Sequence, residues 1–257
     1  MTIEFTKMSE IPRDRWDRPL ITPVDGGKQI AYTRVSTLAK ALDDKTLLTK
    51  WMQRQTLIGL TVRPDLIDKR KLNSIVKDAM AAAKSDQAAN IGTALHALSE
   101  LVDDGVDIST LPAHHQSDLA AYKQTMSGIE ILGKEVFVVC DEVQAAGTFD
   151  RLVRLPDGRI MVADIKTGQH EPTFPHGATT QIAVYAHGHT YDPDKGRMDY
   201  LPDIGVSTTE GLLIHMPAGT GTCDLYLLDI GVGWSLAKTA VAVRAVFKSK
   251  PITKFTP

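Results

Sequence analysis

A pair of β-rich runs joined by Pro156-Asp157-Gly158 constrains the fold more than any other stretch of the chain. Leu152-Val153-Arg154-Leu155 precedes this turn, and Ile160-Met161-Val162-Ala163 follows it. Pro and Asp favour a type I turn, and Gly158 can supply the left-handed residue that closes a three-residue hairpin loop. The sequence therefore predicts an antiparallel hairpin within a central sheet.

The loop length fixes which residues face each other across this hairpin. A three-residue loop pairs Leu155 with Arg159, so that Asp150 lies opposite Asp164. Lys166 stands two residues beyond Asp164 and shares its face, because side chains alternate along a strand. We therefore expect two carboxylates and an ammonium group to converge at one end of the hairpin, as a site for a divalent cation beside a lysine that orients water.

Two other interpretations of the hairpin stay open at this level. A two-residue loop at Asp157-Gly158 would shift the pairing by one residue and put the two carboxylates on opposite faces. The motif Asp164-x-Lys166 is also common in solvated strands. Like charges directly opposite each other destabilise a sheet unless a cation binds between them, which favours the metal site.

Helical patterns on both sides of the hairpin carry polar residues at regular spacing. Gln181 and Tyr185, four residues apart, share one face of a predicted helix. Upstream, Gly92-Thr93-Ala94-Leu95-His96 opens an amphipathic helix, and Glu100 follows one turn later. These residues extend the candidate site beyond the hairpin.

Four motifs occur in a fixed order along the chain: His96, Gly147-x-x-Asp150, Asp164-x-Lys166 and Gln181-x-x-x-Tyr185. This ordered set resembles the RecB-like branch of the PD-(D/E)XK nucleases, which includes exonucleases of the phage lambda type and CRISPR-associated RecB-type exonucleases. The resemblance covers roughly residues 36–185. It implies a phage-encoded α/β protein of restriction-endonuclease-like fold, with helices flanking a mixed central sheet and an N-terminal helical addition.

The resemblance assigns metal binding and catalysis to the hairpin and to the helix before it. Asp150 and Asp164 would be the oxygen ligands of Mg²⁺ or Mn²⁺. The main-chain carbonyl of Ile165 and the imidazole of His96 would be further ligands, and imidazole, which is softer than carboxylate, adds Mn²⁺ to the candidate ions. Lys166 would orient the attacking water. Without the resemblance, His96 would be interpreted as an ordinary helix histidine.

Four further residues are expected to support the reaction. By resemblance, Gln181 and Tyr185 belong to the catalytic set, line the cleft and steady the lysine, the water or the DNA strand. Helix packing is the competing interpretation for Tyr185. Glu135 matches a glutamate on the preceding strand of this family, with a surface role as the alternative, and Glu100 would reach the metal through water.

Composition limits the remaining function classes. Cys140 and Cys223 are the two cysteines, which form no disulfide framework and suit a reducing cytoplasm, that of the host for a phage-encoded protein. They cannot supply the four ligands of the iron–sulfur cluster that many CRISPR-associated relatives carry, so no cluster is expected. No P-loop pattern indicates an ATP-driven motor, and no apolar stretch is expected to span a membrane. The net charge of −2 means that a nucleic-acid partner requires a local basic groove.

We expect the 257 residues to form a single nuclease domain of three segments. Residues 1–34 form an arm, residues 35–128 a helical part with the His96 helix, and residues 129–257 the sheet core with the hairpin and a C-terminal helix. Trp51 in the helical part is either a core residue or a stacking surface for bases.

Two further stretches carry expectations of their own. Lys69-Arg70-Lys71 is either a solvated face or a phosphate contact. Residues 192–204, rich in Pro, Asp and Gly, are expected to be a loop.

These expectations combine into a divalent-metal-dependent deoxyribonuclease: an exonuclease that hydrolyses phosphodiester bonds at single- or double-stranded DNA ends, in recombination, repair or phage DNA processing. It would act alone or beside a recombinase, an annealing protein or a helicase, without a membrane partner. The alternatives are a structure-specific endonuclease, a nuclease acting on RNA, and a non-catalytic DNA-binding or recruitment module of the same fold. The sequence specifies neither polarity nor oligomeric state.

Overall fold

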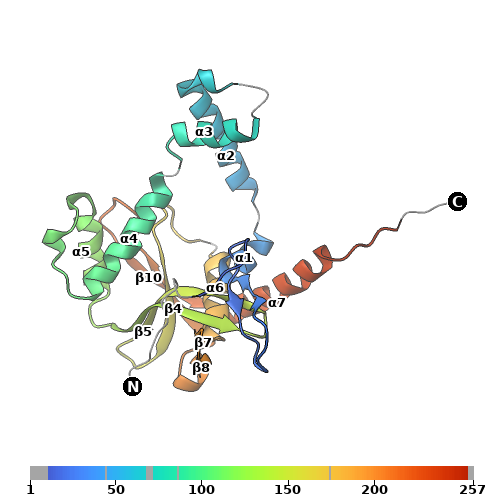
Figure 1. The fold of residues 1–257 in the computed structure, drawn as a ribbon. Coiled ribbons are helices and arrows are strands. Elements are labelled where there is room, and N and C mark those ends of the chain that lie inside the picture. The colour runs from blue at the N-terminus through green and yellow to red at the C-terminus, as the bar shows by residue number, and fades with distance from the viewer. Residues whose placement is uncertain (1–10, 44, 68–71, 86, 174, 254–257) are drawn as a thin grey trace.

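The computed structural model describes residues 11–43, 45–67, 72–85, 87–173 and 175–253. They form a mixed α/β fold in which helices flank a central, mostly antiparallel sheet (Figure 1). The sheet has the order β10-β9-β6-β5-β4-β7-β8, and β3 pairs with β5 off this path. Its strands are β3 (Thr33–Arg34), β4 (Glu130–Cys140), β5 (Ala145–Arg154), β6 (Ile160–Lys166), β7 (His189–Asp192), β8 (Gly196–Tyr200), β9 (Glu210–His215) and β10 (Asp224–Asp229).

A helical part precedes the sheet, as predicted, and two long helices follow its central strands. The α-helices are α1 (Val35–Ala39), α2 (Thr46–Val62), α3 (Leu72–Ala82), α4 (Gln87–Asp103), α5 (Gln116–Thr125), α6 (His176–Ala186) and α7 (Ile230–Phe247). Short 3-10 helices lie between them: η2 (Lys40–Leu42), η3 (Pro64–Leu66), η5 (Ile108–Thr110), η6 (Ala113–His115) and η7 (Leu201–Ile204). The basic cluster Lys69-Arg70-Lys71 lies outside the described residues, so its two interpretations stay open.

The predicted hairpin is β5–β6, and its register is confirmed. The Leu155 N–H donates to the Arg159 carbonyl at 2.9 Å, and Gly158 has a φ of +91°, as a three-residue loop with a left-handed third residue requires. The antiparallel pairs run from Arg154–Ile160 to Arg151–Ala163. Asp150 and Asp164 are the next pair in this register, one step beyond the end of the ladder.

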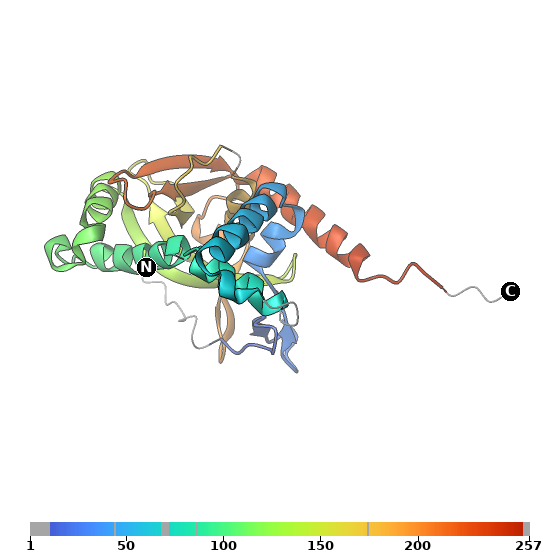
Figure 2. The ribbon, with the colours of Figure 1, turned by 90° about the horizontal axis from the view of Figure 1, so that it is seen from above.

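Two helical layers cover opposite faces of the sheet and form separate cores. Residues of α1, α6 and α7 pack with one set of strand residues, which includes Val162 of β6. Residues of α4 and α5 pack with the alternate set, including Met161 and Ala163. This alternation along β6 is what a strand buried on both faces requires. In contrast, the helical hairpin of α2 and α3 extends away from the sheet (Figure 1), and in the view from above it lies in front of the rest of the molecule (Figure 2).

The described part of the arm contains regular structure. A two-stranded sheet joins β1 (Leu20–Ile21) to β2 (Ile30–Ala31), and β3 follows at the end of the arm. Tyr32 packs in a buried cluster with residues of β4, β5 and β7, and its hydroxyl donates to Asp141 at 2.6 Å. The described part of the arm is therefore held against the sheet by a buried cluster and this polar contact.

The prediction of a loop over residues 192–204 is wrong for most of this segment. Residues 193–195 connect β7 to β8, and β7 extends the sheet by pairing with β4. Gly196, with a φ of +81°, lies at the turn of this hairpin. The composition rich in Pro, Asp and Gly thus marks a turn, while buried Thr190 and Tyr191 anchor the strand that precedes it.

Among the described residues, one helix bears on the expectation that no apolar stretch spans a membrane. α7 is long and apolar enough to do so by length and composition alone. One such helix is weak evidence, because core helices of water-soluble domains pass the same test. Only 22% of α7 is buried, and its buried residues, Ile230, Ala237 and Ala240 among them, belong to the same core cluster as α6, whereas Val246 and Phe247 at its far end are exposed.

Candidate functional site

The end of the β5–β6 hairpin brings Asp150, Asp164 and Lys166 together. The Asp150 carboxylate bends toward β6 and accepts the Ile165 N–H through Oδ2 at 2.6 Å. The Lys166 Nζ lies 2.5 Å from Asp164 Oδ2. Asp164 is buried, whereas the lysine side chain is 42% exposed, so the pair spans the boundary between the core and the solvent.

His96 reaches this group from α4, on the α4–α5 side of the sheet. Its Nδ1 lies 3.5 Å from Asp150 Oδ1. Burial disfavours the charged imidazole, but the hydrogen bond and the negative charge of Asp150 outweigh burial and raise the pKa of His96. The sequence-predicted ligand therefore contacts a predicted carboxylate from a separate element of the fold.

Burial and charge act differently on the two aspartates. Burial raises the pKa of Asp164 to about 6, with the charge of Asp150 adding to the effect and that of Lys166 opposing it. Burial also acts to raise the pKa of Asp150, but hydrogen bonds from His96 and from the Ile165 N–H, with the nearby positive charges, lower it overall. Asp150 is thus the more readily ionised carboxylate of the pair.

Gly92 allows α4 to come close to the end of β6. A Cβ at Gly92 would lie 2.6 Å from Thr167 Oγ1, just beyond Lys166. A larger residue would require the Thr167 side chain to move or this part of α4, which carries His96 one turn later, to shift. The glycine that opens the predicted helix therefore has a packing role in assembling the site.

The site opens into a cleft of about 770 Å³ between α4 and the sheet. The cleft is lined by residues of the candidate site and of its rim, which include Lys40, His96, Glu100, Glu135, Asp150 and Lys166. Glu100 and Glu135, expected only in supporting roles, thus share the cleft with the principal residues. The carboxylates of the cleft give it an acidic floor with cationic groups beside them.

Glu135 has a backbone conformation that side chains rarely adopt. It lies in β4 with a φ of +48°, between the strand pairs Lys134–Arg151 and Val136–Phe149, and therefore across from Asp150. Burial, followed by the charges of Asp150 and Glu100, raises the pKa of Glu135 to about 7. Strained backbone conformations of this kind cluster at functional sites, because a residue keeps one only where the surrounding structure enforces it.

We expect Glu135→Gln to stabilise the metal-free protein more at pH 8 than at pH 5, by about 1 kcal/mol after allowing for partial solvent screening. An acid whose pKa is higher in the folded than in the unfolded chain binds more protons when folded, so stability falls as pH rises from about 4.5 to about 7. Glu135→Gly should add a further ~0.5–1 kcal/mol at both pH values by relieving the left-handed backbone. Urea unfolding in EDTA measures both effects; equal gains for Glu135→Gln at the two pH values would contradict the buried charge.

Gln181 and Tyr185 lie on α6, behind the carboxylates. Burial is the main cause of the raised pKa of Tyr185, the charges of Asp164 and Asp150 add to it, and a hydrogen bond with Gln181 opposes it. A Cβ on Gly147 would lie 3.2 Å from the Tyr185 hydroxyl, so the glycine of Gly147-x-x-Asp150 makes room for this group. Neither α6 residue is among the described residues that line the open cleft.

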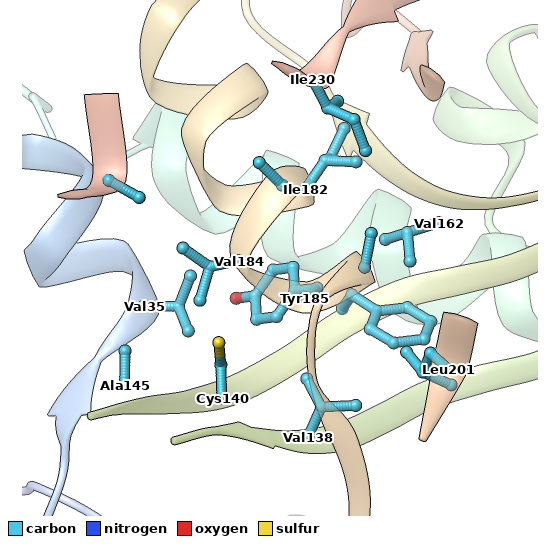
Figure 3. Packing of buried hydrophobic residues seen from close by; sticks show 14 of the residues in the cluster. Val35, Val138, Cys140, Ala145, Val162, Ile182, Val184, Tyr185, Leu201 and Ile230 are labelled. Carbon is cyan, nitrogen blue, oxygen red and sulfur yellow. The ribbon is translucent and has the colours of Figure 1, made fainter. Parts of the chain in front are cut away.

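Tyr185 is also a core residue, as the competing interpretation held. Its ring lies 5.7 Å from that of Phe149, centroid to centroid, and Figure 3 shows it surrounded by apolar side chains such as Val35 and Val138. Packing and proximity to the site are therefore compatible. The ring belongs to the core, and the charges that act on its hydroxyl come from the site.

A buried network beside Asp150 was missed by the sequence reasoning. Arg151 is fully buried, its Nε donates to Asp103 Oδ2 at 2.6 Å, and its Nη2 donates to Ser99 at 2.9 Å. Its Nη1 also donates to the Asp150 carbonyl at 2.8 Å, and Tyr122 of α5 donates to Asp103 at 3.0 Å. The network ties α4 and α5 to β5 next to the site. Ser99 and Asp103, four residues apart on the His96 helix, were the available signal.

The carboxylate oxygens of Asp150 and Asp164 suit a hard divalent cation by their chemistry. Asp164 Oδ2 is buried without a well-aligned hydrogen-bond donor, although Lys166 is close. Among the residues that the structure describes, no three His, Cys, Asp or Glu side chains are grouped so as to hold one ion. His96 and Lys166 instead neutralise the carboxylates, and a cation would have to displace them. The ligand set, including the Ile165 carbonyl, therefore stays a prediction that rests on two carboxylates.

Comparison with known proteins adds no assignment. No protein-family model matches the chain, and no curated protein matches it in sequence.

Proposed function

We propose that the chain is a divalent-metal-dependent DNA exonuclease of RecB-like type, with a restriction-endonuclease-like fold. It would hydrolyse phosphodiester bonds at DNA ends in recombination, repair or phage DNA processing, in the cytoplasm and beside a recombinase, annealing protein or helicase. The observation that carries the proposal is the meeting of Asp150, Asp164 and Lys166 at the end of one hairpin, with His96 arriving from α4. Four sequence motifs in a fixed order support it.

The arrangement of elements is compatible with the proposed fold. The β5–β6 hairpin is followed by α6, which covers one face, and then by β9, which lies parallel to β6 with Lys166 beside His215. The hairpin and α6, which both contribute residues to the candidate site, are therefore consecutive in the chain. A mixed sheet of this kind is the expected framework for the hairpin site.

Phosphodiester hydrolysis needs a positioned water and compensation of the charge that develops on the phosphate. Bound Mg²⁺ or Mn²⁺ would supply both a water of lowered pKa and that compensation. Asp150 and Asp164 would hold the ion, and Lys166, on the cleft side of Asp164, would orient the attacking water. Tyr185 and Gln181 would limit the movement of the carboxylates from behind. The close approach of α4 to the end of β6 at Gly92 would keep His96 within reach of the ion.

The non-catalytic DNA-binding module has one observation in its favour. The two ion pairs, His96–Asp150 and Lys166–Asp164, compensate the negative charge of the site without any cation. Such a closed arrangement could be a structural feature. It predicts DNA retention that is independent of metal and produces no cleavage.

We expect the purified chain to digest end-labelled linear DNA with Mg²⁺ or Mn²⁺ and to lose this activity in EDTA, because the bound cation would lower the pKa of the attacking water. Covalently closed circular DNA of the same sequence should resist. Gel electrophoresis of the products distinguishes digestion from DNA ends, nicking of circles and the absence of cleavage. Nicking of closed circles would identify an endonuclease, digestion restricted to RNA would change the substrate class, and binding without cleavage under all metal conditions would favour the non-catalytic module.

A further inference from the structure

The hairpin of α2 and α3 stands away from the rest of the molecule (Figure 1). The two helices pack closely on each other, since a Cβ on Gly59 would lie 1.7 Å from the Ala79 carbonyl oxygen. Along the first half of α2, by contrast, the described side chains from Lys45 to Arg54 are exposed. An exposed helix of this kind offers a surface that the fold itself does not use.

The charge of α2 is of one sign. The helix contains Lys50 and Arg54 and no acidic residue, and Lys45 precedes it. No carboxylate of the described chain forms an ion pair with Lys50 or Arg54, whereas Arg63, just past the helix, is paired with Asp65. On a chain whose net charge is −2, this is a local positive surface with which the acidic residues in the described part of the chain form no ion pair.

The geometry of α2 suits a phosphate backbone. Lys50 and Arg54 lie one turn apart, about 6 Å along the helix axis, so they can contact nearby phosphates of one strand. Trp51, three residues before Arg54, is 41% exposed and lies beside it on the helix surface. An open groove of about 470 Å³ runs along Lys45, Thr46, Thr49, Lys50 and Gln53. Basic groups beside an exposed aromatic ring are the combination by which proteins hold single-stranded nucleic acid.

Both connections of the hairpin lead to the rim of the candidate site. Lys40, five residues before Lys45, lines the cleft that contains Asp150 and Lys166. The chain that returns from α3 enters α4, whose Gly92 and Thr93 line the same cleft. A strand that leaves the cleft past Lys40 therefore meets the first turns of α2 next.

We propose that Lys50, Trp51 and Arg54, hereafter the α2 basic face, form a second nucleic-acid contact that holds the strand emerging from the cleft. Lys50 and Arg54 bind its phosphates and Trp51 stacks on a base. The identity of the strand as substrate rests on the proposed function, whereas the binding surface itself rests on the charge and exposure of α2. A polyanion is the occupant that matches a basic face. Exposed Leu48 and Met52 lie in the same stretch, and the exposed apolar residues Leu57 and Ile58 lie farther along the helix.

Fluorescence anisotropy of the full chain in EDTA, where nothing is cleaved, tests this contact. For a single strand of about 20 nucleotides we expect Lys50→Gln/Arg54→Gln to weaken binding about 10-fold and to lower the slope of log K against log salt by about 1.4, as two lost phosphate contacts require. Trp51→Ala should weaken binding by about 10-fold through lost stacking, with little change in that slope. A strand of about 6 nucleotides, confined to the cleft, should bind all variants equally.

Lys123→Gln/Lys248→Gln is the matched control, since it removes the same charge from exposed positions on α5 and at the end of α7. Equal affinity and salt dependence for the α2 and control variants would overturn the proposal. A self-association that Leu57→Ser abolishes while DNA binding is unchanged by the α2 variants would also overturn it and assign the surface to a second copy. Loss of affinity in the α2 variants with no cleavage of any nucleic acid would support the contact and refute the nuclease instead.

Discussion

Lys166→Ala is expected to lower the kcat for digestion of linear DNA by about 10²–10⁴-fold with little change in KM, the range that removal of a positioned proton-transfer or water-orienting group produces. The ammonium is the cationic group nearest to Asp164, and its side chain is open to the cleft. Its loss also leaves the buried Asp164 without its principal positive neighbour, which raises the pKa of that carboxyl further and weakens it as a metal ligand. Product formation under single-turnover conditions with Mn²⁺ measures the effect.

Lys123→Ala is the control for this change, because Lys123 is an exposed lysine on α5. It should digest DNA at the wild-type rate. Circular dichroism must show that Lys166→Ala keeps its fold, since the site carries several buried charges. A folded Lys166→Ala protein with near wild-type kcat would remove Lys166 from the mechanism.

Arg151→Met is expected to lower the free energy of unfolding by about 3–5 kcal/mol, the cost of leaving one partner of a buried ion pair uncompensated. The side chains of Arg151 and Asp103 are only 1% and 6% exposed, and three further contacts depend on the guanidinium or its partner. Urea unfolding followed by circular dichroism measures the loss. Because Arg151 also holds the Asp150 carbonyl, activity should fall as well.

Arg154→Met, on the same strand, provides the comparison. Its partner Glu130 is 57% exposed and the arginine itself 43% exposed, so this variant should lose no more than about 1 kcal/mol. Arg151→Met/Asp103→Leu should recover much of the stability lost in the single variant, because no buried charge is then left unpaired. Equal losses for Arg151→Met and Arg154→Met would contradict the structural role of the network.

The hairpin and its register could be predicted from the sequence because local chemistry determines them. Pro156 and Gly158 fix the turn type, and the turn type fixes which residues face each other. The end of the ladder at the Arg151–Ala163 pair could not be predicted in this way. Next to it the Asp150 carboxylate accepts the Ile165 N–H, a contact made only in the folded sheet.

Other features depended on distant parts of the chain. The order of motifs anticipated that His96 would approach the hairpin, but the reason why α4 comes so close, the contact of Gly92 with Thr167, appears only in three dimensions. The β7–β8 hairpin was taken for a loop because its turn residues dominate the composition, while its burial comes from pairing with β4. The left-handed conformation of Glu135 has no sequence signal, since glutamate is an ordinary strand residue by composition.

In the proposed mechanism the carboxylates of Asp150 and Asp164 bind the same cation, and a crystal soaked in Mn²⁺ tests this binding most directly. An anomalous difference map should show a manganese peak within coordination distance of both carboxylates, with Lys166 and His96 displaced from the ion pairs that they form in its absence. A map of equal quality with no peak at these carboxylates, and with the His96–Asp150 and Lys166–Asp164 pairs intact, would contradict the proposed metal-dependent nuclease.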